Sequence, residues 1–294
     1  MQRIIEKAGV LIEALPYIQR FHNAVVVVKF GGSAMEDRAQ ADSILLDIAF
    51  MECVGICPVI VHGGGKSISR KMKAAGIESK FVKGLRVTCE KSIEVVEQVM
   101  KQEINPGIVA SLMRMGAKAE GLHGDSVFEV TRMKDVDPDT GEALDWGFVG
   151  DPHKVHIKAV RALLKKHIIP VITPLGLGKD GKLHNINADV AAAALAGALK
   201  ARKLVFLSDV PGLLRNPKDE ASLIPTLDSG DVEGLVKEGV IDGGMLPKVK
   251  SGIEALHAGV KKVHMIDGRM PHSLLLEVFT DKGVGTEIVE NDQK

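Results

Sequence analysis

Two glycine-rich segments follow two apolar runs in the first quarter of the chain. Lys29 comes after four valines, and the glycine pair and serine of 31–33 follow it directly. The run Pro58–Val61 leads into the three glycines of 63–65, where a helix is expected to begin near Lys66. Glycines let backbone N–H groups come close to a bound anion, and a helix N-terminus adds to this attraction. The two segments predict a phosphate site at the ends of neighbouring strands.

Two other glycine patterns do not support a standard nucleotide loop. Gly65-Lys66-Ser67 resembles the end of a P-loop, but position 60 is isoleucine where that loop needs glycine. The segment Gly176–Gly181 matches GxGxxG, yet the polar residues that close it are typical of a turn and no helix begins there. Both patterns are therefore rejected.

Several polar residues further along are candidates for binding and catalysis. The fork of Arg86 suits a carboxylate, although a lone arginine is also a common surface charge. Asn187 is expected to cap a helix, and Asn185 and Asp189 beside it either share that end or line a polar pocket. Lys248 follows a glycine pair at a helix start, where a solvated helix face is the simpler interpretation.

The elements that must position these residues alternate between strands and helices. Apolar runs at 25–30, 58–61, 168–172, 203–207 and 260–266 are separated by helical stretches near 36–52, from 66, 90–103, 154–166, 187–200 and from 243. We also expect a hairpin at 81–88, a helix capped by Asn105, strands around the turn-rich loop 137–142, a loop from 208 to about 228, and a last strand near 285–289. This alternation predicts an α/β fold with an open, mainly parallel sheet and helices on both faces.

Composition restricts the function classes. Lys+Arg and Asp+Glu are both 38, so the formal charge is zero and gives no basic surface for nucleic acid or acidic membrane. The cysteines, Cys53, Cys57 and Cys89, contain no CxxC pair and predict free thiols rather than a disulfide or metal framework. The longest apolar stretch, Val190–Leu199, is too short to span a bilayer. We expect a cytoplasmic protein with no membrane or nucleic-acid partner.

An amphipathic helix precedes the first strand and lies outside the alternation. Its apolar residues recur at helical spacing between Ile4 and Ile18. It either packs on its own domain or serves as an oligomerisation arm. We expect three regions: the helix in 1–24, a lobe in 25–175 and a second lobe in 176–294.

Taken together, the segments resemble the amino-acid kinase family, and within it the acetylglutamate kinases. They are KFGGSAM at Lys29–Met35, VHGGG at Val61–Gly65, GLRVT at Gly84–Thr88, NINAD at Asn185–Asp189, LSDVPGLL at Leu207–Leu214, GGMLPKV at Gly243–Val249 and HMIDGR at His264–Arg269. The resemblance covers nearly the whole chain. It implies that 25–175 bind N-acetyl-L-glutamate and that 176–294 bind ATP.

The resemblance also implies roles for individual residues. Lys29 and Lys248 would be the phosphoryl-transfer lysines, oriented by Asp189, while Gly32 and Gly64 would donate N–H bonds to the moving group. The acyl amino acid would be held by Gly64, Gly65, Arg86, Asn185 and Asn187. The nucleotide would be held by Ser208, Asp209, Gly212, Leu213, Leu214, Gly243, Gly244 and Met245. Mg²⁺ would be bound mainly by the phosphates of ATP, with no dedicated protein metal site.

The resemblance also implies a role for the N-terminal helix. Acetylglutamate kinases with such a helix resemble the hexameric, arginine-inhibited branch, and Tyr17, His264, Glu277 and Gly283 match that pattern. It therefore implies a homo-hexamer and feedback inhibition by L-arginine.

The expected reaction is ATP-dependent phosphorylation of the side-chain carboxylate of N-acetyl-L-glutamate in arginine biosynthesis. Such a carboxylate has a pKa of about 4.3 and is ionised at neutral pH, so no general base is needed. Lys66 stands where the family usually has proline, which leaves N-acyl-aminoadipate, glutamate or aspartate as alternative acceptors. A non-catalytic amino-acid-sensing module is a further alternative, although both lysines are present.

Overall fold

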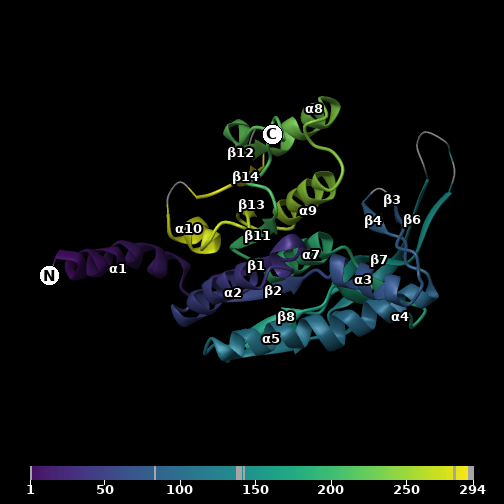
Figure 1. The fold of residues 1–294 in the computed structure, drawn as a ribbon, viewed down its shortest axis with the longest axis horizontal. Coiled ribbons are helices and arrows are strands. Elements are labelled where there is room, and N and C mark those ends of the chain that lie inside the picture. Colours follow the sequence, from purple (N-terminus) through teal and green to yellow (C-terminus); the bar gives the residue numbers. More distant parts are fainter. Residues whose placement is uncertain (1, 83, 137–140, 142, 281–282, 291–294) are drawn as a thin grey trace.

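A twisted eight-stranded sheet forms the centre of the molecule (Figure 1). The computed structural model describes the chain except residues 1, 83, 137–140, 142, 281–282 and 291–294. The strands run in the order β12 (Thr226–Asp228), β14 (Thr286–Val289), β13 (Val263–Asp267), β11 (Lys203–Ser208), β1 (Val25–Phe30), β2 (Cys57–His62), β8 (Ile169–Ile172) and β5 (Ala119–Leu122). Every pair from β13 to β5 is parallel, and β14 is antiparallel to β13. The predicted open, mainly parallel sheet is confirmed.

Helices cover both faces of this sheet. The α-helices of the described residues are α1 (Gln2–Phe21), α2 (Arg38–Cys53), α3 (Gly65–Ala74), α4 (Glu90–Gln98), α5 (Asn105–Arg114), α6 (Lys158–Leu164), α7 (Ala188–Leu199), α8 (Val232–Lys237), α9 (Met245–His257) and α10 (Ser273–Phe279). Successive side chains of β1 point to opposite faces, so Val27 joins a core under α7 and α9, while Val26 and Val28 join a core under α2, α5 and α10. The valine run is thus buried on both faces, as its composition predicts.

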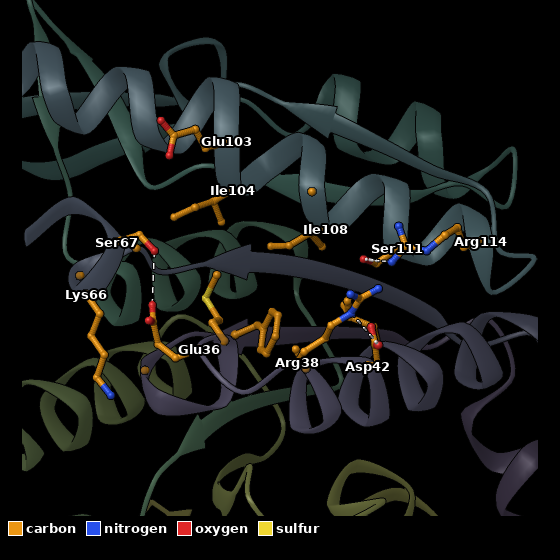
Figure 2. A pocket seen from close by; sticks show the side chains of 18 residues that line it. Glu36, Arg38, Asp42, Lys66, Ser67, Glu103, Ile104, Ile108, Ser111 and Arg114 are labelled. Atoms are coloured by element: carbon orange, nitrogen blue, oxygen red, sulfur yellow. Dashed lines mark hydrogen bonds and ion pairs between the residues drawn. The ribbon is translucent and has the colours of Figure 1, made fainter. Parts of the chain in front are cut away.

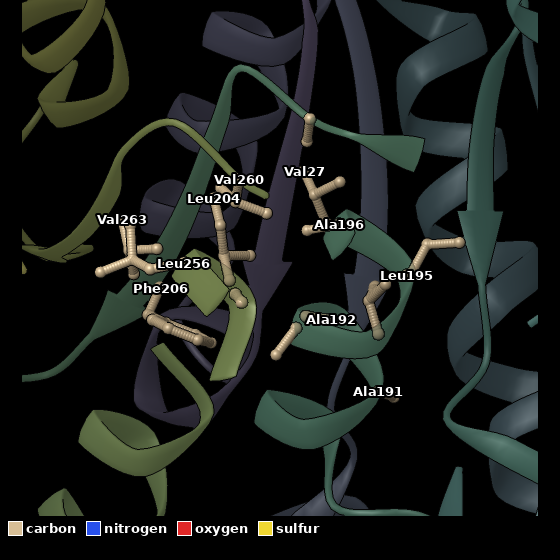
Figure 3. Close-up of a cluster of buried hydrophobic side chains, with 14 of the residues drawn as sticks. Val27, Ala191, Ala192, Leu195, Ala196, Leu204, Phe206, Leu256, Val260 and Val263 are labelled. Atoms are coloured by element: carbon tan, nitrogen blue, oxygen red, sulfur yellow. The ribbon is translucent and has the colours of Figure 1, made fainter. Parts of the chain in front are cut away.

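Close packing of α7 on the sheet depends on its alanines. In Figure 3 Ala196 lies beside Val27 and Leu204, while Ala191 and Ala192 lie nearer the N-terminal end of the same helix; all of these side chains are fully buried. Small side chains allow the helix to approach the strands closely. This brings the N-terminus of α7 to the carboxyl end of β1.

A second, smaller group of strands lies beside the main sheet. β6 (Phe128–Val136), β7 (Ala143–Val155), β9 (Leu175–Gly178) and β10 (Leu183–Asn185) pair in a closed ring. β9 and β10 form an antiparallel hairpin, so the polar residues 179–181 that close the GxGxxG match form its turn, as predicted, and no helix begins there. The predicted hairpin at 81–88 is present as β3 (Phe81–Val82) and β4 (Leu85–Arg86). Of the loop 137–142, only Gly141 lies within the described residues.

Several expected boundaries differ from the structure. Residues 154–155 end β7, so the helix expected from 154 begins only at Lys158. The prediction that Asn105 caps a new helix is wrong, because α4 continues through a π-helical turn, Val99–Ile104, straight into α5. α8 and α10 were not predicted; both have fewer than eight residues, too few for a clear helical period.

α1 projects from one end of the body and touches α10 (Figure 1). Large apolar side chains on it are exposed in this chain, among them Val10, Leu11 and Ile12. The predicted helix is confirmed, whereas its role as an oligomerisation arm stays a prediction. In the part of the chain that the structure describes, no helix is both long and apolar enough to cross a membrane.

Candidate active site

Asp189 lies between two lysines that come from different parts of the fold. Lys29 is next to last in β1, Lys248 lies in the first turns of α9, and Asp189 is in the first turn of α7. The Nζ of Lys29 is 3.0 Å from Oδ1 of Asp189, and the Nζ of Lys248 is 3.0 Å from Oδ2. The three predicted catalytic side chains therefore meet at one buried carboxylate.

Electrostatics keep this carboxylate ionised. Burial works to raise the pKa of Asp189, but the charges of Lys29 and Lys248 outweigh burial and hold the pKa at about 2. Burial lowers the pKa of Lys248, and Lys29 adds to that effect while Asp189 opposes it. Asp189 is therefore a fixed counter-ion and not a proton acceptor at neutral pH.

A cavity of about 570 Å³ opens on the β2 side of these residues. Its lining includes every residue predicted to hold the acceptor or to donate an N–H bond: Gly32, Gly64, Gly65, Arg86, Asn185 and Asn187. Lys29 and Asp189 line it too. The two glycine segments are neighbours because β1 and β2 pair in parallel, and Gly63 N donates to the Phe30 carbonyl at 2.7 Å. The sequence prediction that they lie side by side is confirmed.

Arg86 lies in the wall of this cavity and is only 6% exposed. One terminal nitrogen donates to the Gly65 carbonyl and to Ser69 Oγ, both at 2.8 Å, and the other donates to Ser79 Oγ at 2.5 Å. Its guanidinium also stacks on Phe81 at 4.6 Å. The simpler interpretation of a surface charge is therefore wrong for Arg86.

Asn187 caps α7 as predicted. Its Oδ1 accepts from the N–H groups of Asp189 at 2.8 Å and Val190 at 3.3 Å. Asn185 ends β10 beside Val149 of β7. Both asparagines also line the cavity, so capping and a polar pocket occur together.

A second cavity, of about 300 Å³, lies on the other side of the lysine pair. Lys29 and Gly32 line both cavities, whereas Lys248 lines the second. Predicted nucleotide residues in its wall are Ser208, Asp209, Gly244 and Met245. Four others, Gly212, Leu213, Leu214 and Gly243, are not part of this wall; Leu213 is buried, with its N–H bonded to Thr286.

A third cavity, of about 420 Å³, lies between α1, β13 and α10. Tyr17, His264, Glu277 and Gly283, which sequence resemblance grouped together, all line it. Burial works to raise the pKa of Glu277, but His264 and Lys203 outweigh it and bring the pKa to about 2. Lys203 Nζ lies 2.6 Å and His264 Nδ1 2.8 Å from the carboxylate.

A further cavity was not anticipated from the sequence. It lies between α2, α3 and α5, with a volume of about 300 Å³. Figure 2 shows Glu36 bonded to Ser67 near Lys66 at one end and Arg38 paired with Asp42 at the other. The wall of Gly64, Gly65 and Lys66 separates it from the acceptor cavity, because these residues line both.

Sequence reasoning missed residues that shape the site without belonging to a motif. Ser69 holds Arg86 in place, and Met100 of the π-helical turn lines the acceptor cavity. The only sequence signal for Ser69 is its position about one helical turn after Gly65, where α3 begins. Cys53, Cys57 and Cys89 are free, and among the described residues no group of three His, Cys, Asp or Glu side chains is arranged to hold a metal ion.

Comparison with known proteins defines the class. Residues 24–267 match the amino acid kinase family. The chain therefore belongs to the amino acid kinase family, and the predicted fold of that family is confirmed.

The chain is similar to acetylglutamate kinases over nearly its whole length. It is 49% identical over 295 residues to the acetylglutamate kinase of Heliobacterium modesticaldum, covering 99% of this chain and 100% of that one. It is 45% identical over 288 residues to that of Archaeoglobus fulgidus, covering 97% and 99%. These relatives confirm the predicted resemblance to acetylglutamate kinases and the predicted enzyme class, whereas the arginine-inhibited hexameric branch stays a prediction.

Solved structures show the same fold. N-acetylglutamate synthase from Neisseria gonorrhoeae, in complex with coenzyme A and N-acetyl-glutamate, superposes with a TM-score of 0.82 at 26% identity; the match covers 97% of this chain but only 63% of the synthase. Carbamate kinase from Giardia lamblia bound to AMP-PNP superposes with a TM-score of 0.64 at 16% identity, covering 92% and 99%, and shares the fold alone.

Proposed function

We propose that this chain transfers the γ-phosphoryl group of ATP to the side-chain carboxylate of N-acetyl-L-glutamate, as a step of arginine biosynthesis. The observation that carries the proposal is the double ion pair of Asp189 with Lys29 and Lys248, between two cavities. The acetylglutamate kinases among the relatives support the choice of substrate.

The lysines would act on the charge of the transferred group. Phosphoryl transfer depends on alignment and on compensation of charge spread over the phosphoryl oxygens. Lys29 borders both cavities and Lys248 borders the nucleotide side, so their ammonium groups would approach the γ-phosphoryl group from two directions. Gly32 and Gly64 would add backbone N–H donors.

The acceptor would occupy the larger cavity. Arg86 would bind a carboxylate, and Gly65 and Asn185 would hold the acyl amino acid. Asn187 would use its Nδ2 group, because its Oδ1 caps α7. The acceptor carboxylate needs no general base, because its ordinary pKa of about 4.3 leaves it ionised at neutral pH.

ATP would occupy the smaller cavity, in the lobe of residues 176–294, with the acceptor in 25–175. Ser208, Asp209, Gly244 and Met245 would hold it there, and Gly212, Leu213, Leu214 and Gly243 would support that wall from outside. Both oxygens of Asp189 are paired with lysines, which leaves Asp209 as the carboxylate in the cavity wall. One protein carboxylate fits a Mg²⁺ ion that is held mainly by the phosphates of ATP. The ion would neutralise part of the phosphate charge.

We further propose that L-arginine binds the third cavity and inhibits a cytoplasmic hexamer. The cavity wall carries both signs of charge, with Glu277 and Glu287 against Arg20, Arg202 and Lys262, which suits a zwitterionic, cationic amino acid. Exposed apolar side chains on α1 support an interface with other subunits. The synthase from Neisseria gonorrhoeae was also solved with L-arginine.

A single assay tests the reaction and identifies the acceptor. The protein is incubated with MgATP, hydroxylamine and, separately, N-acetyl-L-glutamate, N-acetyl-aminoadipate, glutamate or aspartate, and the hydroxamate is measured. We expect hydroxamate with N-acetyl-L-glutamate above all others. A preference for another acid would reassign the acceptor and point to Lys66, which lines the same cavity. No hydroxamate with any acid would contradict the kinase proposal.

A further inference from the structure

His62 is a fully buried histidine at the end of β2, directly before the triple glycine. It is not part of the acceptor cavity wall, whereas Gly63 and Gly64 are. Burial lowers its pKa to about 4, so the ring is neutral at physiological pH. A neutral ring has one nitrogen that donates and one that accepts.

The neighbours of the ring determine which nitrogen donates. Nδ1 lies 2.9 Å from the carbonyl oxygen of Gly63, which accepts only, so Nδ1 must carry the proton. Nε2 lies 3.2 Å from Nδ2 of Asn105, and that amide nitrogen also donates to the Val171 carbonyl at 2.9 Å. Nε2 is therefore the acceptor, and one tautomer satisfies every contact.

The bond to Gly63 has a consequence on the opposite side of the same peptide. In a trans peptide the C=O and the following N–H lie in one plane and point in opposite directions. Anchoring the Gly63 carbonyl on the buried side, against His62, therefore turns the N–H of Gly64 away from the core. Gly64 borders the acceptor cavity, and two glycines in succession offer little steric resistance to a flip of this peptide.

Asn105 connects this arrangement to the helix that forms another wall of the cavity. It is the first residue of α5, immediately after the π-helical turn, and it is buried. Ile104 beside it packs closely on Gly64: a Cβ added to Gly64 would lie 2.9 Å from its Cδ1. The side chain of Asn105 thus links β2 and β8 to α5. The π-helical turn just before Asn105 places this side chain between the two strands.

We propose that His62 is a positioning residue: its Nδ1–H bond to the Gly63 carbonyl holds the Gly63–Gly64 peptide so that the Gly64 N–H faces the bound phosphoryl group or acceptor. Asn105 fixes the ring in the required tautomer. This inference rests on the proposed function, in which Gly64 donates to the moving group.

Two substitutions separate the two edges of the ring. In His62→Asn the amide nitrogen takes the place of Nδ1 and keeps the bond to Gly63. In His62→Gln the amide occupies the place of Nε2, keeps the contact with Asn105 and loses the bond to Gly63. Both variants remove a buried ring and are expected to lower Tm alike.

We expect kcat for hydroxamate formation to stay within about threefold of wild type in His62→Asn. In His62→Gln it should fall on the order of 100-fold, with a much smaller change in the KM for ATP, as for loss of one transition-state donor. A purely structural histidine would give both variants the same kcat at matched Tm, and that result would overturn the proposal.

A second measurement needs no folded variant. In ¹⁵N-histidine-labelled wild-type protein, the His62 ring should show the Nδ1–H tautomer between pH 6 and 8. An Nε2–H tautomer or an imidazolium would contradict the proposal whatever the reaction proves to be. Conversely, a protein that forms no hydroxamate but shows the Nδ1–H tautomer would refute the proposed function and leave the peptide geometry intact.

Discussion

Lys29 and Lys248 are held by the same carboxylate: each ammonium nitrogen lies 3.0 Å from a different oxygen of Asp189. One lysine comes from the second-last position of β1 and the other from α9, near the opposite end of the chain. Because Asp189 has a pKa of about 2, it stays charged and keeps both lysines in place over the whole physiological pH range.

Replacing Lys248 by alanine tests the proposed role of this lysine. We expect kcat to fall on the order of 100- to 1,000-fold while the KM for ATP changes by less than about threefold, because the contact strengthens in the transition state. Lys250→Ala is a matched control in the same helix, on an exposed position, and should leave both constants near wild type. A near-normal kcat in Lys248→Ala would refute the role.

Replacing Asp189 by asparagine tests the electrostatic link. Asp189 raises the pKa of Lys248 against the lowering effects of burial and of Lys29, so its loss should lower that pKa further. The ammonium would then lose its proton at a lower pH, and the alkaline limb of the kcat profile should move to lower pH. An alkaline limb at the wild-type position would show that Lys248 does not depend on this carboxylate.

Most residues of this candidate site could be predicted from the sequence, because each is marked by its own residue type and by its neighbours in the chain. Glycine segments, a helix cap and two lysines are visible as residue types at the ends of expected elements, and the fold only has to bring them together. Arg86 shows the limit of such reasoning, since its burial and its bonds to Gly65, Ser69 and Ser79 depend on tertiary packing. Residue type alone gave no preference for the buried alternative.

The prediction of a helix start at Asn105 was wrong for a different reason. Asn105 and Pro106 together are a normal signal for a helix start. In the structure the preceding turn widens to a π-helix and α5 continues from α4, so the asparagine side chain is free to reach His62 and Val171. A local signal was overridden by a buried hydrogen-bond network.

Glu277 should make stability depend on acid pH. Its folded-state pKa of about 2 lies below its ordinary value of 4.5, so its contribution is complete above pH 4.5 and is lost as pH falls toward 2. We expect urea unfolding to show a large loss of stability for Glu277→Gln at pH 7 and a much smaller loss at pH 3. Glu94→Gln, at an exposed position of α4, should differ from wild type equally little at both pH values.

If the difference between wild type and Glu277→Gln were the same at pH 7 and pH 3, the ion pairs with Lys203 and His264 would not hold Glu277 charged. The test depends on differences between proteins at the same pH, because the other carboxylates titrate in wild type, in Glu277→Gln and in Glu94→Gln alike. Their contributions to the pH dependence of stability therefore cancel.

Deleting residues 1–20 tests the proposed regulation. These residues include Tyr17 and Arg20, which line the third cavity, and most of the exposed apolar face of α1. We expect a smaller oligomer by light scattering, retained kinase activity and no inhibition by L-arginine. Tyr17→Ala should weaken inhibition without changing oligomer size. Unchanged size and inhibition in the deletion would contradict both proposals.

The most direct test of the reaction follows oxygen atoms. N-acetyl-L-glutamate labelled with ¹⁸O in both side-chain carboxylate oxygens is incubated with the enzyme, MgATP and hydroxylamine, and the released phosphate is examined by ³¹P NMR. If the carboxylate attacks phosphorus, the bridging oxygen leaves with phosphate when hydroxylamine attacks the carbonyl carbon. The account predicts one ¹⁸O in each phosphate released with hydroxamate. Unlabelled phosphate formed in equal amount would contradict it.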